Sequence, residues 1–388
     1  MSKNFLIVAL CFCVIALGYF TAPMISGLIK GIFNAKEKAI AVNSGSSADI
    51  DNNEDIVDLT FRNGVYIPIN QLTTPEGLTN VIQMCESNKF DAVVIEIKGD
   101  SGILCYKSEM PIATAIGSGG ETGIDLKKVA ARFKENNIYT IAKIVCFKDN
   151  FAPESDAELS VPYIGGGRWW NEYKWLNPYI KRSREYLSEI SEEIIKSGFD
   201  EVMLDEVKFP DSGRLDILGF GDDEVQTPKP QMLTEFINEV CETVHNAGGK
   251  LSLCIPASGI YTDEVNIYSG QKFNFNDLKI DYLSSYFQPS VLKITHKQCD
   301  IPSDLFYQAD DNLLPLFDAV LSKAVNRLTR ENDKITLRPF IQDYNTPSRP
   351  LLPEDIKAQI ESCRVYGSAG YITFNEYGVY TLLYDENK

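Results

Sequence analysis

Histidine is nearly absent from the sequence: only His245 and His296 occur among its 388 residues. His245 ends a helical pattern, and His296 lies in a polar loop. This scarcity argues against a His-rich zinc site and against a Ser-His-Asp hydrolase site. No metal-binding motif occurs either, so we expect no metal and no other cofactor.

Basic residues are too few to balance the acidic ones: 37 Lys and Arg stand against 54 Asp and Glu, which gives a net charge of −17 at pH 7. A nucleic-acid partner requires a basic face that replaces the counterions of the phosphates. We therefore expect no nucleic-acid partner. The same imbalance disfavours broad binding to anionic wall polymers or anionic lipids.

No CxxC pair occurs among the nine cysteines, and seven of them lie beyond the apolar N-terminal segment. An odd set without paired spacing does not resemble a disulfide framework. Most of these cysteines fall inside apolar strand or helix patterns. We interpret them as small buried apolar residues.

The N-terminus carries an uncharged run from Phe5 to Phe20. Such a run can cross the hydrocarbon core of a bilayer, about 30 Å thick, as a helix. Residues 1–27 are therefore predicted to be a transmembrane signal-anchor. Residues 28–60 are predicted to be a flexible stalk, because Ser, Asn, Asp and Gly dominate residues 35–58. We expect a single-pass protein of the cell membrane whose remaining part, residues 61–385, is extracytoplasmic. Signal-peptide cleavage, which would give a secreted protein, is the alternative.

Eight short β-branched runs alternate with amphipathic stretches over the rest of the chain. The runs are Gly64–Ile69, Ala92–Lys98, Tyr139–Phe147, Glu201–Phe209, Lys250–Ile255, Tyr282–Phe287, Thr336–Tyr344 and Gly370–Asn375. The helical stretches are Pro75–Asn88, Asp125–Asn136, Asn177–Ser197, Pro230–Ala247, Leu313–Asn332 and Pro353–Tyr366. Strands joined by helical crossovers run parallel, and eight such units close into an α/β fold, the (β/α)8 TIM barrel. An open doubly wound sheet, the alternative, usually has a Gly-rich phosphate loop after its first strand, where this chain has Asn70–Thr74.

Polar side chains gather toward the C-terminal ends of the predicted strands, where function sits in such barrels. The candidate catalytic residues among them are Asp205, Glu376 and Glu96. The candidate substrate-binding residues are Lys98, Asp100, Lys143, Lys208, Gln342, Asp343 and Asn375. Because side chains alternate along a strand, Glu96 and Lys98 are both predicted to point into the barrel. The pattern favours a preorganised site; a structural layer of ion pairs that plugs the barrel is the alternative.

The predicted loop after the third strand, residues 148–176, contains all three tryptophans. Trp169 and Trp170 are candidate sugar-binding residues, because aromatic faces bury apolar surface well and commonly line ligand clefts. A hydrophobic lid over the barrel mouth is the alternative reading.

These residue types predict two-carboxylate chemistry on a glycosidic bond. Asp205 is our candidate for the nucleophile or charge stabiliser, and a nearby lysine (Lys98, Lys143 or Lys208) would favour its charged form. Glu96, Glu376 and Glu206 are the candidates for the proton donor. Glu206 alternates away from Asp205 unless the strand end twists.

Several segments together resemble the putative glycosyl hydrolase domain family over about residues 62–382. They are Ala92–Gly102, Ile138–Asp149, Gly198–Pro210, Leu337–Tyr344 and Gly370–Asn375. The resemblance implies a TIM-type barrel that hydrolyses sugars, with Asp205 retained from the family's strand-four pattern.

The chain departs from that family pattern in three places. Lys143 and Lys208 stand where Arg is expected, which removes bidentate carboxylate recognition. Cys254 stands near the position where the family tends to place an Asp, and Phe287–Val291 differ from its Tyr-Pro-Ser-His pattern. We therefore expect a membrane-anchored glycoside hydrolase-like protein that acts on a cell-wall or extracellular polysaccharide. A non-catalytic carbohydrate-binding or envelope scaffold protein on the same barrel is the alternative.

Overall fold

The computed structural model describes residues 60–167, 174–262, 265–295 and 299–381. The predicted anchor, the predicted stalk up to residue 59, Trp169 and Trp170 lie outside these ranges. Within them, no helix has both the length and the apolar character that a membrane crossing requires. The anchor and the stalk therefore stay predictions.

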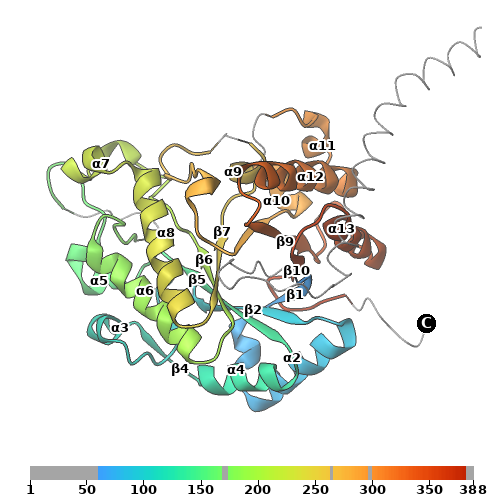
Figure 1. Cartoon of the computed structure of the whole chain (residues 1–388), viewed down its shortest axis with the longest axis horizontal. Helices are drawn as coiled ribbons and strands as arrows, with labels where there is room; N and C mark the ends of the chain where they lie inside the picture. The colour runs from blue at the N-terminus through green and yellow to red at the C-terminus, as the bar shows by residue number, and fades with distance from the viewer. Residues whose placement is uncertain (1–59, 168–173, 263–264, 296–298, 382–388) are drawn as a thin grey trace, which may run out of the picture. The chain divides into compact units, whose positions relative to one another are not determined.

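Eight parallel strands form a closed barrel, which confirms the predicted α/β (β/α)8 fold (Figure 1). Closure is direct, because β1 pairs in parallel with both β2 and β10. The barrel strands are β1 (Arg62–Ile67), β2 (Ala92–Lys98), β5 (Tyr139–Val145), β6 (Glu201–Asp205), β7 (Lys250–Cys254), β8 (Tyr282–Tyr286), β9 (Thr336–Gln342) and β10 (Gly370–Phe374).

Helices cross from strand to strand in most of the repeats. The long ones are α2 (Pro75–Asn88), α4 (Leu126–Glu135), α6 (Lys181–Lys196), α8 (Lys229–Asn246), α12 (Leu313–Glu331) and α13 (Pro353–Val365). Local sequence explains their starts: Thr74 accepts a hydrogen bond from the Gly77 N–H ahead of Pro75, and Asp125 accepts one from the Lys128 N–H. In the repeat between β7 and β8, the described residues form only α9 (Ser258–Tyr261) and the 3-10 turn η4 (Phe275–Asp277).

Shorter helices and turns occupy the loops between these elements. They are η1 (Ile69–Leu72), α5 (Ala152–Ser155), η2 (Ala157–Leu159), η3 (Leu215–Ile217), α7 (Asp222–Gln226), α10 (Pro289–Thr295) and α11 (Ser303–Tyr307). All but η1 follow the C-terminal ends of β5, β6 and β8, with two of these short elements in each of the three loops.

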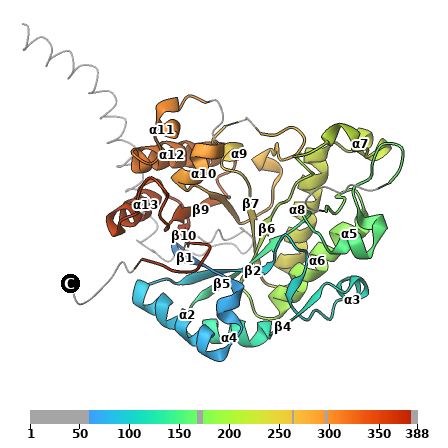
Figure 2. The same ribbon diagram turned by 180° about the vertical axis from the view of Figure 1, so that it is seen from behind.

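The loop after β2 contains an excursion that the sequence reading did not predict: β3 (Leu104–Tyr106), α3 (Pro111–Ile116) and β4 (Gly119–Ile124). It lies beside α6 in both views (Figures 1 and 2). Glu193 of α6 fixes it by accepting hydrogen bonds from the Tyr106 and Ser108 hydroxyls, both at 2.5 Å, and from the Glu109 N–H at 2.9 Å.

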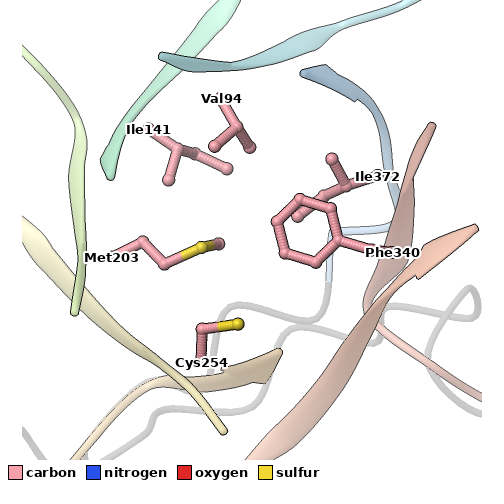
Figure 3. Close-up of a cluster of buried hydrophobic side chains, with 6 residues drawn as sticks. All are labelled: Val94, Ile141, Met203, Cys254, Phe340 and Ile372. Atoms are coloured by element: carbon pink, nitrogen blue, oxygen red, sulfur yellow. The ribbon is translucent and has the colours of Figure 1, made fainter. Parts of the chain in front are cut away.

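Two layers fill the barrel interior below the strand ends. Six strands contribute one side chain each to an apolar layer of Val94, Ile141, Met203, Cys254, Phe340 and Ile372, all at most 1% exposed (Figure 3). Toward the strand starts, the buried Arg338 Nη1 lies 3.0 Å from both carboxylate oxygens of Glu201. The apolar layer separates this ion pair from any group at the other end, so the charges at the C-terminal ends of the strands form a separate cluster.

Candidate active site

Three charged side chains stand directly above the apolar layer. Glu96, Lys143 and Asp205 each lie two residues beyond a member of that layer on their strand, and therefore on the same inward face. The Lys143 Nζ lies 2.9 Å from Glu96 Oε2 and 2.9 Å from Asp205 Oδ2. The Lys143 side chain is 6% exposed, whereas that of Asp205 is 13% and that of Glu96 is 33% exposed. Both carboxylates are thus partly exposed, Glu96 more than Asp205, while the ammonium group is covered.

The electrostatics of this triad hold Lys143 in its charged form. Burial alone would lower the pKa of Lys143, but the charges of Asp205 and Glu96 outweigh that effect, and the pKa lies well above its ordinary value. Tyr286 packs against the apolar layer, and burial raises the pKa of its hydroxyl well above the usual range. A neutral hydroxyl and a fixed ammonium charge therefore flank the two carboxylates.

Glu206 follows Asp205 in a left-handed backbone conformation, with a φ of 51°. Such a backbone costs about 1–3 kcal/mol in a residue other than glycine and is frequent at functional sites. The turn lets the Glu206 N–H donate to Asp205 Oδ1 at 2.8 Å, while Glu206 Oε2 lies 3.1 Å from the Lys208 Nζ. Burial raises the pKa of Glu206, although the Lys208 charge opposes the shift. Glu206 is thus suited to carry a proton.

Lys98 does not reach this cluster, contrary to the strand-alternation prediction. The pairing of β2 with β5 shifts register between Glu96 and Lys98, so the alternation fails at that point. The Lys98 ammonium is fully buried, pairs with Asp149 Oδ2 at 2.9 Å and donates to the Val145 carbonyl at 2.7 Å. Lys98 is therefore a structural residue, unavailable to a substrate.

Asp100 and Lys208 lie in loops beside the cluster. Asp100 Oδ2 lies 2.6 Å from the Lys148 Nζ. Lys208 contacts Asp211 Oδ2 at 3.0 Å in addition to Glu206, and its Nζ lies 5.9 Å from the ring centroid of Trp175. Trp175, the one tryptophan among the described residues, is 5% exposed and packs inside the loop.

On the opposite side of the barrel, three predicted binding residues bond mainly to other groups of the protein, and two of them, Asp343 and Asn375, hold the chain after β10. The Asp343 carboxylate accepts hydrogen bonds from the Thr381 N–H at 2.9 Å and hydroxyl at 2.7 Å. Asn375 donates to the Asp343 carbonyl, and Gln342 donates to the Tyr344 carbonyl. All three are at most 8% exposed, so their roles in the structure are mainly positional.

Glu376, by contrast, is exposed and lies near the mouth of the barrel. Burial raises the pKa of Tyr66 to about 12, and the charges of Glu96 and Glu376 add to this rise. Both glutamates are therefore close enough to the Tyr66 hydroxyl for their charges to affect its pKa. The position keeps Glu376 as a candidate for contact with a ligand.

Cys254 belongs to the apolar layer but also lies beside Asp205. Burial, followed by the Asp205 charge, raises the pKa of the thiol well above its ordinary value. A neutral, 1% exposed thiol thus occupies the position where the resemblance leads us to expect a carboxylate. Among the residues with described positions, no three or more His, Cys, Asp or Glu side chains are grouped so that they could hold a metal ion.

Comparison with known proteins gives a family and a fold. The model of the family described as "Putative glycosyl hydrolase domain" matches residues 64–380. No curated protein matches the sequence.

Among solved structures, the glycoside hydrolase domain of PgaB (BpsB) from Bordetella bronchiseptica superposes with a TM-score of 0.58 at 13% identity, over 82% of this chain and 95% of that one. A hypothetical protein from Ruminiclostridium thermocellum is 30% identical over 49% of this chain and 96% of its own, with a TM-score of 0.45. The glycoside hydrolase domain of PelA from Pseudomonas aeruginosa has 14% identity, 82% and 95% coverage and a TM-score of 0.41. The Bordetella likeness supports the barrel fold.

Proposed function

The chain belongs to the putative glycosyl hydrolase domain family, and on that premise we propose that it hydrolyses a cell-wall or extracellular polysaccharide through carboxylate acid/base chemistry. The observation that carries the proposal is the Glu96–Lys143–Asp205 cluster, which stands at the C-terminal ends of β2, β5 and β6 with both carboxylates accessible. This is the end at which barrels of this type place their active sites.

The roles follow from the chemistry of glycosidic bond cleavage. Asp205 attacks the anomeric carbon or stabilises the positive charge that develops there, while a proton donor protonates the departing glycosidic oxygen. Glu206 fits the donor best, because its raised pKa favours the protonated form and its backbone turns it from the outward face of β6. Glu96 and Glu376 remain the alternative donors.

The substrate and location are part of the proposal. The uncharged run from Phe5 to Phe20 supports a membrane anchor with the barrel outside the cytoplasm. A carbohydrate is then the partner, reached in the cell wall or beyond it. The net charge of −17 favours a neutral or cationic polysaccharide over a polyanion.

The experiment that tests this function is reducing-end release from a panel of polysaccharides by the full chain and by Asp205→Asn. We expect the wild type to release product and the variant to lose turnover, with an unchanged circular dichroism spectrum. Glu86→Gln is the matched control, because it removes one charge from the exposed face of α2. An Asp205→Asn chain that retains full turnover would refute the assignment.

A second candidate function is carbohydrate binding without cleavage. The buried thiol of Cys254 beside Asp205 favours it, because a thiol with a raised pKa cannot replace a carboxylate as an acid or a base at neutral pH. Binding on a glycan array without product release from the same sugars would support this reading. Product release that depends on Asp205 would exclude it.

A further inference from the structure

A pocket of about 290 Å³ opens in the loops that follow β6 and β7, beyond the Glu96–Lys143–Asp205 cluster. Leu218 and Phe220 contribute apolar surface to its lining. Ile267 and Tyr268 also line it and are 82% and 47% exposed, which makes an apolar lip open to solvent. A volume near the lower end of ligand sites, about 300 Å³, suits a ligand of one ring.

The walls of this pocket are held in place by bonds between the two loops. The Phe209 N–H donates to the Ser269 carbonyl at 2.9 Å, and the Asn266 amide donates to the Asp211 carbonyl at 3.0 Å. Asn266 also accepts a hydrogen bond from the Tyr268 N–H at 3.0 Å. The exposed lip is thus a fixed feature, and a preformed site loses little entropy when a ligand binds.

The chemistry of the lining suits a sugar ring. Phe220 packs on Phe209 with centroids 5.0 Å apart, and the Lys229 Nζ lies 4.9 Å from the Phe220 centroid. Lys229 also lies 3.4 Å from a carboxylate oxygen of Glu224. Phe220 is only 6% exposed and supports the lining, whereas the Tyr268 ring is 47% exposed and can cover the C–H face of a pyranose. The Lys229 ammonium and the Glu224 carboxylate can bind the sugar hydroxyls.

A chain of ion pairs leads from the candidate active site to this pocket. Glu206, next to Asp205, pairs with Lys208, and Lys208 pairs with Asp211. Asp211 is next to Pro210, which lines the pocket. We propose that the pocket is a distal subsite that binds one sugar unit of the polysaccharide, so that the site prefers long chains over short ones. This inference rests on the proposed function and deepens it.

The test measures binding and turnover as a function of chain length. The full chain carrying Asp205→Asn is applied to a glycan array that presents each sugar series from the disaccharide to the octasaccharide. Its binding is compared with that of the chain that carries both Asp205→Asn and Tyr268→Ala. We expect signal that rises with length and a loss of about five- to tenfold on the long members, with short members unchanged. Ile267→Asp should act in the same direction, and Tyr307→Ala, an exposed tyrosine of α11, is the matched control.

The outcomes separate this inference from the proposed function. Length-dependent binding that Tyr268→Ala leaves unchanged overturns the subsite, even where Asp205-dependent hydrolysis is observed. Length-dependent binding that Tyr268→Ala reduces, without hydrolysis by the wild type, supports the subsite and rejects the enzyme. If the chain binds no glycan of any length, the subsite proposal is overturned. The same holds if Ile267 and Tyr268 bind only a protein.

Discussion

Replacing Lys143 with methionine should destabilise the fold and disable the site together. The substitution keeps the apolar stem of the side chain but removes the ammonium that lies 2.9 Å from an oxygen of Glu96 and 2.9 Å from an oxygen of Asp205. Two carboxylates would then share the top of the barrel without a counter-charge. Below them, the apolar layer offers Asp205 only the Cys254 thiol, a weak hydrogen-bond donor that carries no counter-charge.

The magnitude follows from the burial of the three groups. Removing one partner from a buried ion pair costs about 3–5 kcal/mol, because the remaining charge is left without compensation. Glu96 keeps 33% of its side chain exposed, so water screens part of this cost, and we expect a loss of about 3 kcal/mol. The loss should shrink at acidic pH, because protonation of a carboxylate removes the uncompensated charge.

Urea denaturation of the wild type and of Lys143→Met, at neutral and acidic pH, measures this difference. The free energy of unfolding should fall at neutral pH without a change in the m-value, and Glu96→Gln in the variant background should restore part of it. A loss below about 1 kcal/mol at neutral pH would show that the triad is exposed and loosely held, and would refute the reasoning.

Three further predictions concern a proton donor, a buried pair and a histidine. If Glu206 donates the proton, turnover falls as the pH rises through its raised pKa, and this fall forms the alkaline limb of the pH–rate profile. The profile of Glu206→Gln should lack that limb, and an unchanged limb would contradict the role of Glu206 as proton donor. Lys98→Met should cost about 3–5 kcal/mol in denaturant, because it leaves Asp149 buried and unpaired, and a near-neutral effect would contradict the structural role given to this pair. The Asp281 hydrogen bond, aided by Cys241, raises the pKa of His245 from 6.5 to about 10, so its stabilisation is complete below about pH 6.5 and is lost toward pH 10. His245 is 43% exposed, so the effect is about 1 kcal/mol or less, and thermal melts of His245→Gln should show a flatter pH dependence over that window; an identical dependence would contradict it.

The barrel was predictable because its pattern repeats eight times. The period-two alternation also brought Glu96, Lys143 and Asp205 to one face, since each strand continues regularly past its apolar-layer residue. The same rule failed for Lys98, where a register shift interrupts the pairing of β2. A register shift of this kind cannot be predicted from the pattern of apolar and polar residues.

Glu206 and Tyr286 were harder to place for different reasons. A positive φ at a glutamate is not signalled by its residue type, so the turn that carries Glu206 away from the outward face could be raised only as a possibility. Tyr286 could have been found, because it lies two residues from Ser284 and four from Tyr282 on the inward face of β8. The β3–β4 excursion was missed because Leu104–Tyr106 is too short to show a period and Gly119–Ile124 does not alternate.

Asp343 and Asn375 show the limit of a strand-end rule. Both stand where function is expected, yet their hydrogen bonds hold the segment after β10, which takes the place of an eighth helix among the described residues. A sequence shows that a polar residue ends a strand but does not show which distant backbone group it binds.

The most direct test of the account is a crystal structure of the Asp205→Asn chain with a bound oligosaccharide from a series that the glycan array identifies. The account predicts a glycosidic bond above the apolar layer, with its anomeric carbon facing residue 205 and its bridging oxygen within reach of Glu206, Glu96 or Glu376. A saccharide held elsewhere, with no contact to any of these four positions, would contradict it.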